Sequence, residues 1–222
     1  NDDTVNPDPL NEDSTFDKLT GHSTSKNNLV IANGNDAIIN TEGTLASVTV
    51  SSGSSEGPTD DLRVKPDLMG NGTGLYSTYD TSDSAYNSST GTSMASPNVA
   101  GSLLLLQQYY KETHGNFMRS ATLKGLALHT ADDVAILGPD AASGWGLMNT
   151  KKAAETVTKK DFQSIISEIE LVEGGTYTLV VKSDGLMPLL ASISWTDLPG
   201  VANTGVVNDP TPVLVHDLDI KV

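Results

Sequence analysis

The chain has 222 residues, and its 13 Lys and Arg against 28 Asp and Glu give a formal net charge of −15 at pH 7. Such a negative surface repels the phosphate backbone of nucleic acids, which excludes DNA and RNA as main partners. The longest apolar run, residues 103–106, is far shorter than the roughly 18 residues of a membrane span, and the absence of Cys excludes disulfides and a thiol nucleophile.

The first third of the chain predicts loops and short strands. Residues 1–20 are rich in Asn, Asp and Pro, which favour loops, and this irregular beginning indicates a chain that starts inside a larger domain. The β-branched runs at residues 28–32 and 44–50 predict two strands. Residues 53–62 return to a turn-rich loop.

A helical pattern follows between residues 93 and 110. Its apolar residues recur every three or four positions, at Ala95, Val99, Leu103, Leu106 and Tyr110. This spacing predicts a helix with one buried face. Pro97 falls in the first turn, where a missing N–H group is tolerated, and Thr92 or Ser93 occupies the capping region. Gly101 is expected to let another element pack closely against the helix.

Further helices are expected after this one. Gly115 is expected to end the first helix, because glycine adopts the left-handed conformation of a helix terminus without strain. Residues 119–130 predict a second helix. Asn149 is expected to cap a third helix that runs through residues 153–154.

The chain beyond residue 160 predicts an all-β domain. Four of its segments alternate in polarity or are rich in β-branched residues: 165–171, 176–182, 189–195 and 213–222. Residues 173–175 are typical of a hairpin turn. The last segment ends without a following turn, so this domain is expected to be truncated at residue 222.

The segment around Ser93 has features that a reactive serine requires. A serine hydroxyl is a weak nucleophile that needs a general base and donors for the oxyanion formed on attack. A helix N-terminus supplies free N–H groups and the positive end of the helix dipole, and Gly91 leaves room for a substrate backbone. The alternative is that Ser93 only caps the helix, as most serines at this position do.

Residues 91–101 read Gly-Thr-Ser-Met-Ala-Ser-Pro-Asn-Val-Ala-Gly, which resembles the nucleophile signature of the subtilisin-like serine peptidases at every fixed position. Further family landmarks follow in the expected order, at residues 57–59, 64–67, 72–78 and 144–149. Residues 194–197 and 214–219 look like parts of the β-sandwich that follows the catalytic domain in secreted bacterial members. The resemblance implies an α/β fold: part of a parallel-sheet peptidase domain at residues 1–158, then part of an all-β, jelly-roll-like sandwich at residues 161–222.

The resemblance also implies roles for single residues. Ser93 corresponds to the nucleophile of a serine endopeptidase, and its own backbone N–H, supported by Thr92, faces the oxyanion. Asn1 corresponds to the second oxyanion donor, which the family carries in an Ala-Gly-Asn segment; the alternative is an ordinary loop asparagine. Residues 70–72 read Gly-Asn-Gly, where the family commonly has Ala-Pro-Gly, a difference expected to affect a loop.

The catalytic Asp and His motifs of the family are not in this sequence. Its four histidines lie outside the glycine-flanked context of the catalytic one: His22, His114, His129 and His216. We therefore expect an upstream segment of the same parent chain to supply both residues, and the fragment alone to be nearly inactive.

The expected function is cleavage of peptide bonds in protein or peptide substrates through an acyl-enzyme, with secretion implied by the family. The alternative is a catalytically dead homologue that serves as a binding or adhesion module. An unrelated α/β hydrolase is disfavoured, because Met94-Ala95 leaves no glycine where its Gly-x-Ser-x-Gly motif requires one.

No cofactor is expected for the chemistry, whereas structural calcium is an option because the family often binds it. Oxygen ligands are present at Asp60, Asp61, Asp67, Asp217 and Asp219, although a solvated acidic surface also explains these residues. Trp145 and Trp195 are expected to be core anchors rather than a platform for carbohydrate.

Overall fold

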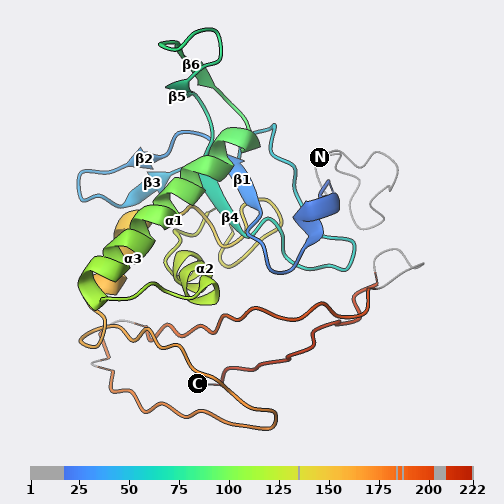
Figure 1. Ribbon diagram of the computed structural model, residues 1–222, viewed down its shortest axis with the longest axis vertical. Coiled ribbons are helices and arrows are strands. Elements are labelled where there is room, and N and C mark those ends of the chain that lie inside the picture. The colour runs from blue at the N-terminus through green and yellow to red at the C-terminus, as the bar shows by residue number, and fades with distance from the viewer. Residues whose placement is uncertain (1–17, 135, 184, 187, 203–208, 222) are drawn as a thin grey trace.

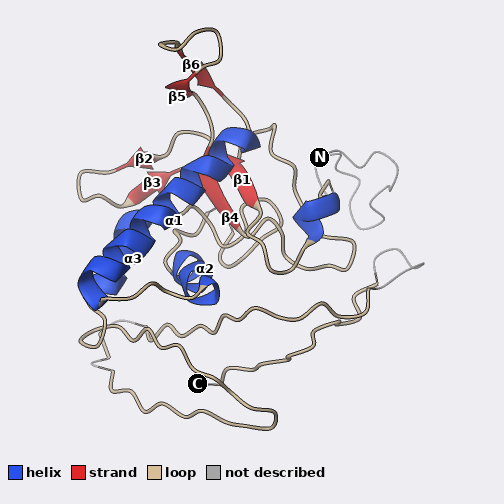
Figure 2. Ribbon diagram, viewed as in Figure 1, coloured by secondary structure: helices blue, strands red, loops and turns tan. Residues whose placement is uncertain are grey.

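The computed structural model describes residues 18–134, 136–183, 185–186, 188–202 and 209–221 (Figure 1). Within these ranges the short 3-10 helix Gly21–Thr24 comes first, and the strands and α-helices are coloured in Figure 2. The strands are β1 (Ile31–Gly34), β2 (Ile38–Ile39), β3 (Leu45–Ser47), β4 (Leu68–Asn71), β5 (Leu75–Thr78) and β6 (Tyr86–Ser89). The α-helices are α1 (Thr92–His114), α2 (Ser120–His129) and α3 (Thr150–Thr158).

The centre of the fold is the parallel pair of β1 and β4. Their register runs from Ile31 opposite Leu68 to Gly34 opposite Asn71. A parallel bridge to Leu147 lies on the other edge of β4. Parallel strands need both faces covered, and both are covered here, by α1 on one side and by loops on the other.

Alternate residues of the two strands divide between these faces. Toward α1, the core residues are Leu68, Val99 and Ala127, with Ile31 packed against them. Toward the loops, the core residues are Ala32, Met69 and Val134. Because side chains alternate across a strand, the short apolar runs of β1 and β4 supply both layers.

The predicted helical face of α1 is confirmed. Ala95, Val99, Leu106 and Tyr110 are buried, and Leu103 is half-buried. The helix ends at Gly115, whose φ of 84° is left-handed and whose N–H donates to the carbonyl of Lys111.

The expectation for Gly101 was wrong. This glycine is exposed, and a Cβ added to it would meet nothing within 4 Å. It lies on the side of α1 opposite the apolar stripe, so no element in the described part of the chain requires its small size.

Both later helices are found where the sequence predicts them. The second, predicted at residues 119–130, is α2, which is shorter by one residue at each end. The side chain of Asn149 accepts a hydrogen bond from the N–H of Lys152 and caps α3. A core cluster joins the three helices, made of Leu106, Tyr110, Met118, Leu126, Ala153 and Val157. Among the described residues, none of the helices is long and apolar enough to cross a membrane.

The strand predictions near the N-terminus are partly right. The run at residues 28–32 forms β1, which begins three residues later, and the run at 44–50 forms the shorter β3 and a bridge from Val50 to Gly34. The hairpins β2–β3 and β5–β6 were not predicted, because β2 has only 2 residues and the strands β5 and β6 are short and mostly polar.

The strands predicted beyond residue 160 are not found among the described residues of that range. The tail is an extended trace below the helices in Figure 1, and its apolar side chains are largely exposed. A strand exists only when a neighbour completes its ladder of N–H and C=O groups, and the described segments of the tail form no such ladder. Sequence alternation alone was therefore not sufficient evidence for strands.

Candidate functional site

Ser93 is the second residue of α1, and its side chain is exposed to solvent. The N-cap position belongs to Gly91, and no side chain caps the helix there. The Gly91 carbonyl accepts hydrogen bonds from the N–H groups of Met94 at 2.9 Å and Ala95 at 3.2 Å. The hydroxyl of Ser93 is therefore not the cap that the alternative interpretation of this residue required.

The turn before Ser93 depends on glycine. Gly91 has a φ of 154°, which side chains of L-residues rarely allow. Its N–H donates to the carbonyl of Gly72 at 2.9 Å, and the N–H of Gly72 donates to the carbonyl of Gly34 at 3.2 Å. These two hydrogen bonds fix the turn to the carboxyl ends of β1 and β4, where parallel-sheet folds commonly place their sites.

Gly70 and Gly72 lie between this sheet edge and α1. A Cβ on Gly70 would lie 2.5 Å from Cγ2 of Val99, and one on Gly72 would lie 2.4 Å from Oδ1 of Asn33 and 2.5 Å from the Gly91 carbonyl. The expectation that this tripeptide affects only a loop was wrong, because Gly70 and Asn71 are part of β4. Glycine at these positions lets α1 approach the sheet closely.

Asn33 is a site residue that the sequence analysis did not identify. It is 1% exposed, and neither atom of its side-chain amide has a hydrogen-bond partner in the described part of the chain. It faces the turn at Gly91 across Gly72. The available signal was a polar residue directly after the apolar run that forms β1.

The other predicted site residues are placed as follows. Thr92 opens α1 and lines a cavity of about 90 Å³ together with Leu19, Ser23, Val30, Ile31, Ser55 and Pro66. Asn1 lies outside the described residues.

The histidines make their contacts away from Ser93. His114 Nε2 lies 3.2 Å from the carbonyl of Val157, and His129 Nδ1 lies 2.8 Å from Oγ of Ser192. Burial lowers the pKa of His129 below its usual range, and the charge of Lys152 adds to this effect. His22 is exposed in the 3-10 helix.

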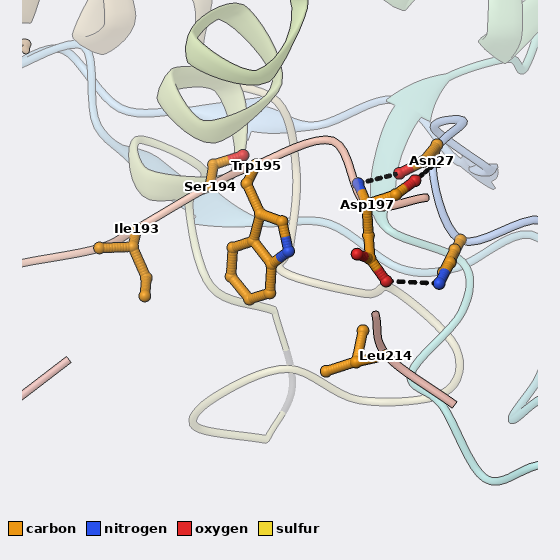
Figure 3. A pocket seen from close by; sticks show the side chains of 7 residues that line it. Asn27, Ile193, Ser194, Trp195, Asp197 and Leu214 are labelled. Atoms are coloured by element: carbon orange, nitrogen blue, oxygen red, sulfur yellow. Dashed lines mark hydrogen bonds and ion pairs between the residues drawn. The ribbon is translucent and has the colours of Figure 1, made fainter. Parts of the chain in front are cut away.

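A second polar cluster joins the tail to the body of the molecule (Figure 3). Asp197 is 5% exposed and accepts hydrogen bonds from Nζ of Lys26 at 2.5 Å and from the N–H groups of Val215 and His216 at 2.9 and 2.8 Å. Asn27 pairs with the backbone of Asp197 through both atoms of its amide. The hydrogen bond from Lys26, with those from the two N–H groups, holds the pKa of Asp197 well below its usual range, although burial opposes this shift.

An open pocket of about 220 Å³ lies at this junction, lined by Lys26, Asn27, Ile193, Ser194, Trp195, Asp197 and Leu214. Ser194 donates to the carbonyl of Ala121 in α2 at 2.9 Å, which adds a contact between tail and body. The segments that the sequence marked as sandwich landmarks thus meet each other and the loop at residues 26–27.

Two of the acidic residues considered as calcium ligands have other partners. Asp61 pairs with Arg63 at 2.7 Å, and Asp67 pairs with the buried Lys65 at 2.6 Å. No group of three or more His, Asp or Glu in the described ranges is arranged to hold a metal ion. Trp145 is 48% exposed, so the expectation that it anchors the core was wrong.

Comparison with known proteins gives consistent results. The profile of the subtilase family matches residues 3–146. The PI-type and PIII-type proteinases of Lactococcus lactis subsp. cremoris are each 32% identical to the chain over 123 residues, which is 47% of this chain and 6% of each relative. The chain thus spans only a small part of their length.

Solved structures show the same fold. The CspB protease of Clostridium perfringens superposes with a TM-score of 0.51 and 22% identity, over 65% of this chain and 30% of that one. The self-cleaved protease domain of PatA gives a TM-score of 0.50 and 17% identity, over 65% of this chain and 46% of that one.

Proposed function

The chain belongs to the subtilase family, and on that premise we propose that it carries the nucleophile, Ser93, of a serine endopeptidase. The observation that carries the proposal is the exposed Ser93 hydroxyl in the first turn of α1, directly after the glycine turn at Gly91. A helix N-terminus is a suitable place for an oxyanion, because backbone N–H groups and the positive end of the helix dipole stabilise negative charge there.

In the proposed reaction, Oγ of Ser93 attacks the carbonyl carbon of a peptide bond while a histidine accepts its proton. The backbone N–H of Ser93 and the side chain of Asn1 donate to the oxyanion, and Thr92 supports the turn. The histidine then protonates the leaving amine, and water hydrolyses the acyl-enzyme. These steps need no cofactor, and any bound calcium has a structural role.

The proposal assigns the catalytic Asp and His to an upstream segment of the same parent chain. The exposed apolar surface supports such a partner: Leu104 and Leu105 on α1 are 70% and 62% exposed, and Ile38 and Ile39 of β2 are also exposed. We propose that the upstream segment covers these exposed apolar side chains. A parallel sheet of two strands also gains stability when further strands extend it.

The remaining parts of the proposal concern substrate, location and tail. The small cavity beside Thr92 has apolar walls from Leu19, Val30 and Ile31, which suit a substrate side chain close to the nucleophile. We place the enzyme outside the cell, in keeping with its acidic surface and family. We assign residues 161–222 to a β-sandwich because residues 194–197 and 214–219 resemble parts of the sandwich that follows the catalytic domain in secreted bacterial members of the family.

The test is hydrolysis of a denatured protein substrate by the chain combined with its upstream segment. Ser93→Ala is expected to remove nearly all activity, because loss of a triad member leaves only residual catalysis. Ser96→Ala is the matched control, since Ser96 is also exposed in the first turns of α1, and it should retain activity. Equal activity of Ser93→Ala and the unchanged chain would refute the proposal and favour a binding or adhesion module.

A further inference from the structure

The β5–β6 hairpin stands out from the body of the molecule beyond the N-terminus of α1 (Figure 1). Its register pairs Tyr76 with Ser88 and Thr78 with Tyr86, so these four side chains share one face of the hairpin. The rings of Tyr76 and Tyr86 stack, with centroids 5.5 Å apart and planes 21° from parallel. The two tyrosines are nevertheless 72% and 56% exposed. They pack on each other and leave their outer surfaces to solvent.

The chemistry of this hairpin favours a cationic partner. Residues 75–89 include Asp80 and Asp83 but no Lys or Arg. The faces of tyrosine rings attract ammonium and guanidinium groups, and nearby carboxylates add charge complementarity. Aromatic face and acidic tip thus select the same kind of side chain, that of Lys or Arg.

The hairpin is fixed directly to the glycine turn that precedes Ser93. The N–H of Gly74 donates to Oγ1 of Thr90 at 2.9 Å, at the base of the hairpin. The N–H of Gly91 donates to the carbonyl of Gly72 at 2.9 Å, on the opposite chain of the same base. β6 ends at Ser89, four residues before Ser93. A strand rises about 3.3 Å per residue, so a polypeptide bound at Ser93 reaches the hairpin within a few residues.

We propose that the β5–β6 hairpin is a docking surface for a basic segment of the polypeptide substrate, in which Tyr76 and Tyr86 bind a Lys or Arg side chain a few residues from the cleaved bond. This inference rests on the proposed peptidase function, because the substrate is what brings a polypeptide to this place. It adds a preference for positive charge in the substrate that the turn around Ser93 does not itself impose.

The first experiment measures binding and does not depend on catalysis. Fluorescence anisotropy of a fluorescein-labelled peptide that contains Arg is compared with that of its Gln counterpart, both titrated with the Ser93→Ala chain. The Arg peptide should bind more tightly, and the double variant Tyr76→Ala, Tyr86→Ala should weaken its binding about two- to thirty-fold, the range of single cation–π contacts. The Gln peptide should change little.

Two further variants separate docking from folding. Tyr177→Ala removes a tyrosine of similar exposure from the tail and should leave the binding of both peptides unchanged. The double variant Asp80→Asn, Asp83→Asn keeps the tyrosine stack. It should weaken the binding of the Arg peptide and make that binding less dependent on salt.

The second experiment uses the chain with its upstream segment. The tyrosine double variant should raise KM for the Arg peptide and leave unchanged both kcat and the rate at which a fluorophosphonate reacts with Ser93. Equal binding of the Arg and Gln peptides, or equal losses for both in the double variant, would overturn the docking proposal. Failure of Ser93 to react with the fluorophosphonate would instead refute the peptidase function. The anisotropy result would still show whether the hairpin binds the Arg peptide.

Discussion

Replacing Gly70 by Ala tests how closely α1 packs against the sheet. The new methyl group would lie 2.5 Å from Cγ2 of Val99 and 3.1 Å from the carbonyl of Ala95, both inside normal contact distance. Val99 is fully buried and, as a β-branched side chain in a helix, has one preferred rotamer, so it cannot turn away. Overpacking of this kind costs about 1–3 kcal/mol of the free energy of unfolding.

A double-mutant cycle assigns that cost to its cause. Val99→Ala alone removes two buried methyl groups and should cost about 2 kcal/mol or more, counting the cavity. In the double variant the smaller side chain at position 99 makes room for the methyl group added at position 70, so the combined cost should fall below the sum by about 0.5–3 kcal/mol. Urea unfolding followed by tryptophan fluorescence measures all three variants. Strictly additive costs would refute the close contact between β4 and α1.

Three other substitutions have defined outcomes. Asn149→Ala removes the side-chain cap that accepts from Lys152 at 2.8 Å and should lower the free energy of unfolding by about 1 kcal/mol, measured by urea titration. Asn33→Val removes a buried amide without a described partner and should be neutral or stabilising by about 1 kcal/mol, whereas a clear loss of stability would mean that the amide is hydrogen-bonded. Asp197→Asn should weaken the tail junction, because the charge-assisted hydrogen bond from Lys26 is lost, and hydrogen exchange at residues 215–216 should become faster. Because the pKa of Asp197 is lowered from 3.8, the junction should be fully formed above about pH 4 and should weaken as the pH falls toward the lowered pKa.

The helices were predictable because each has strong local signals. Four of the five apolar positions of α1 are buried as the periodicity requires, and Gly115 and Asn149 mark helix ends through their own backbone and side-chain chemistry. Such signals act within one or two helical turns, so they can be read from the sequence without knowledge of the tertiary contacts.

The parts that failed depend on distant contacts. Gly70 and Gly72 are ordinary loop glycines in the sequence, and only the fold brings them against Val99 and Asn33. The strands expected after residue 160 require neighbours that the alternation of polarity cannot supply. Asp197 meets Lys26 across 171 positions of the chain, a separation that no local pattern spans.

The site was predictable to a similar degree. The glycine turn and the helix start around Ser93 have local sequence signals, whereas the hydrogen bonds that fix the turn, from Gly91 to Gly72 and from Gly72 to Gly34, depend on the fold. The amide of Asn33 beneath the turn and the tyrosine hairpin beside it became visible only with the fold, because neither has a sequence motif of its own.

The role of Ser93 as the nucleophile is tested most directly by reaction with a serine-directed fluorophosphonate, followed by mass spectrometry of proteolytic peptides. We expect an adduct on Ser93 when the chain is combined with its upstream segment, and at most trace labelling of the chain alone. With the segment present, the peptide should carry no adduct in Ser93→Ala and should be fully labelled in Ser96→Ala. Absence of the adduct with the segment present, or an adduct on another serine, would contradict the assignment of Ser93 as the nucleophile.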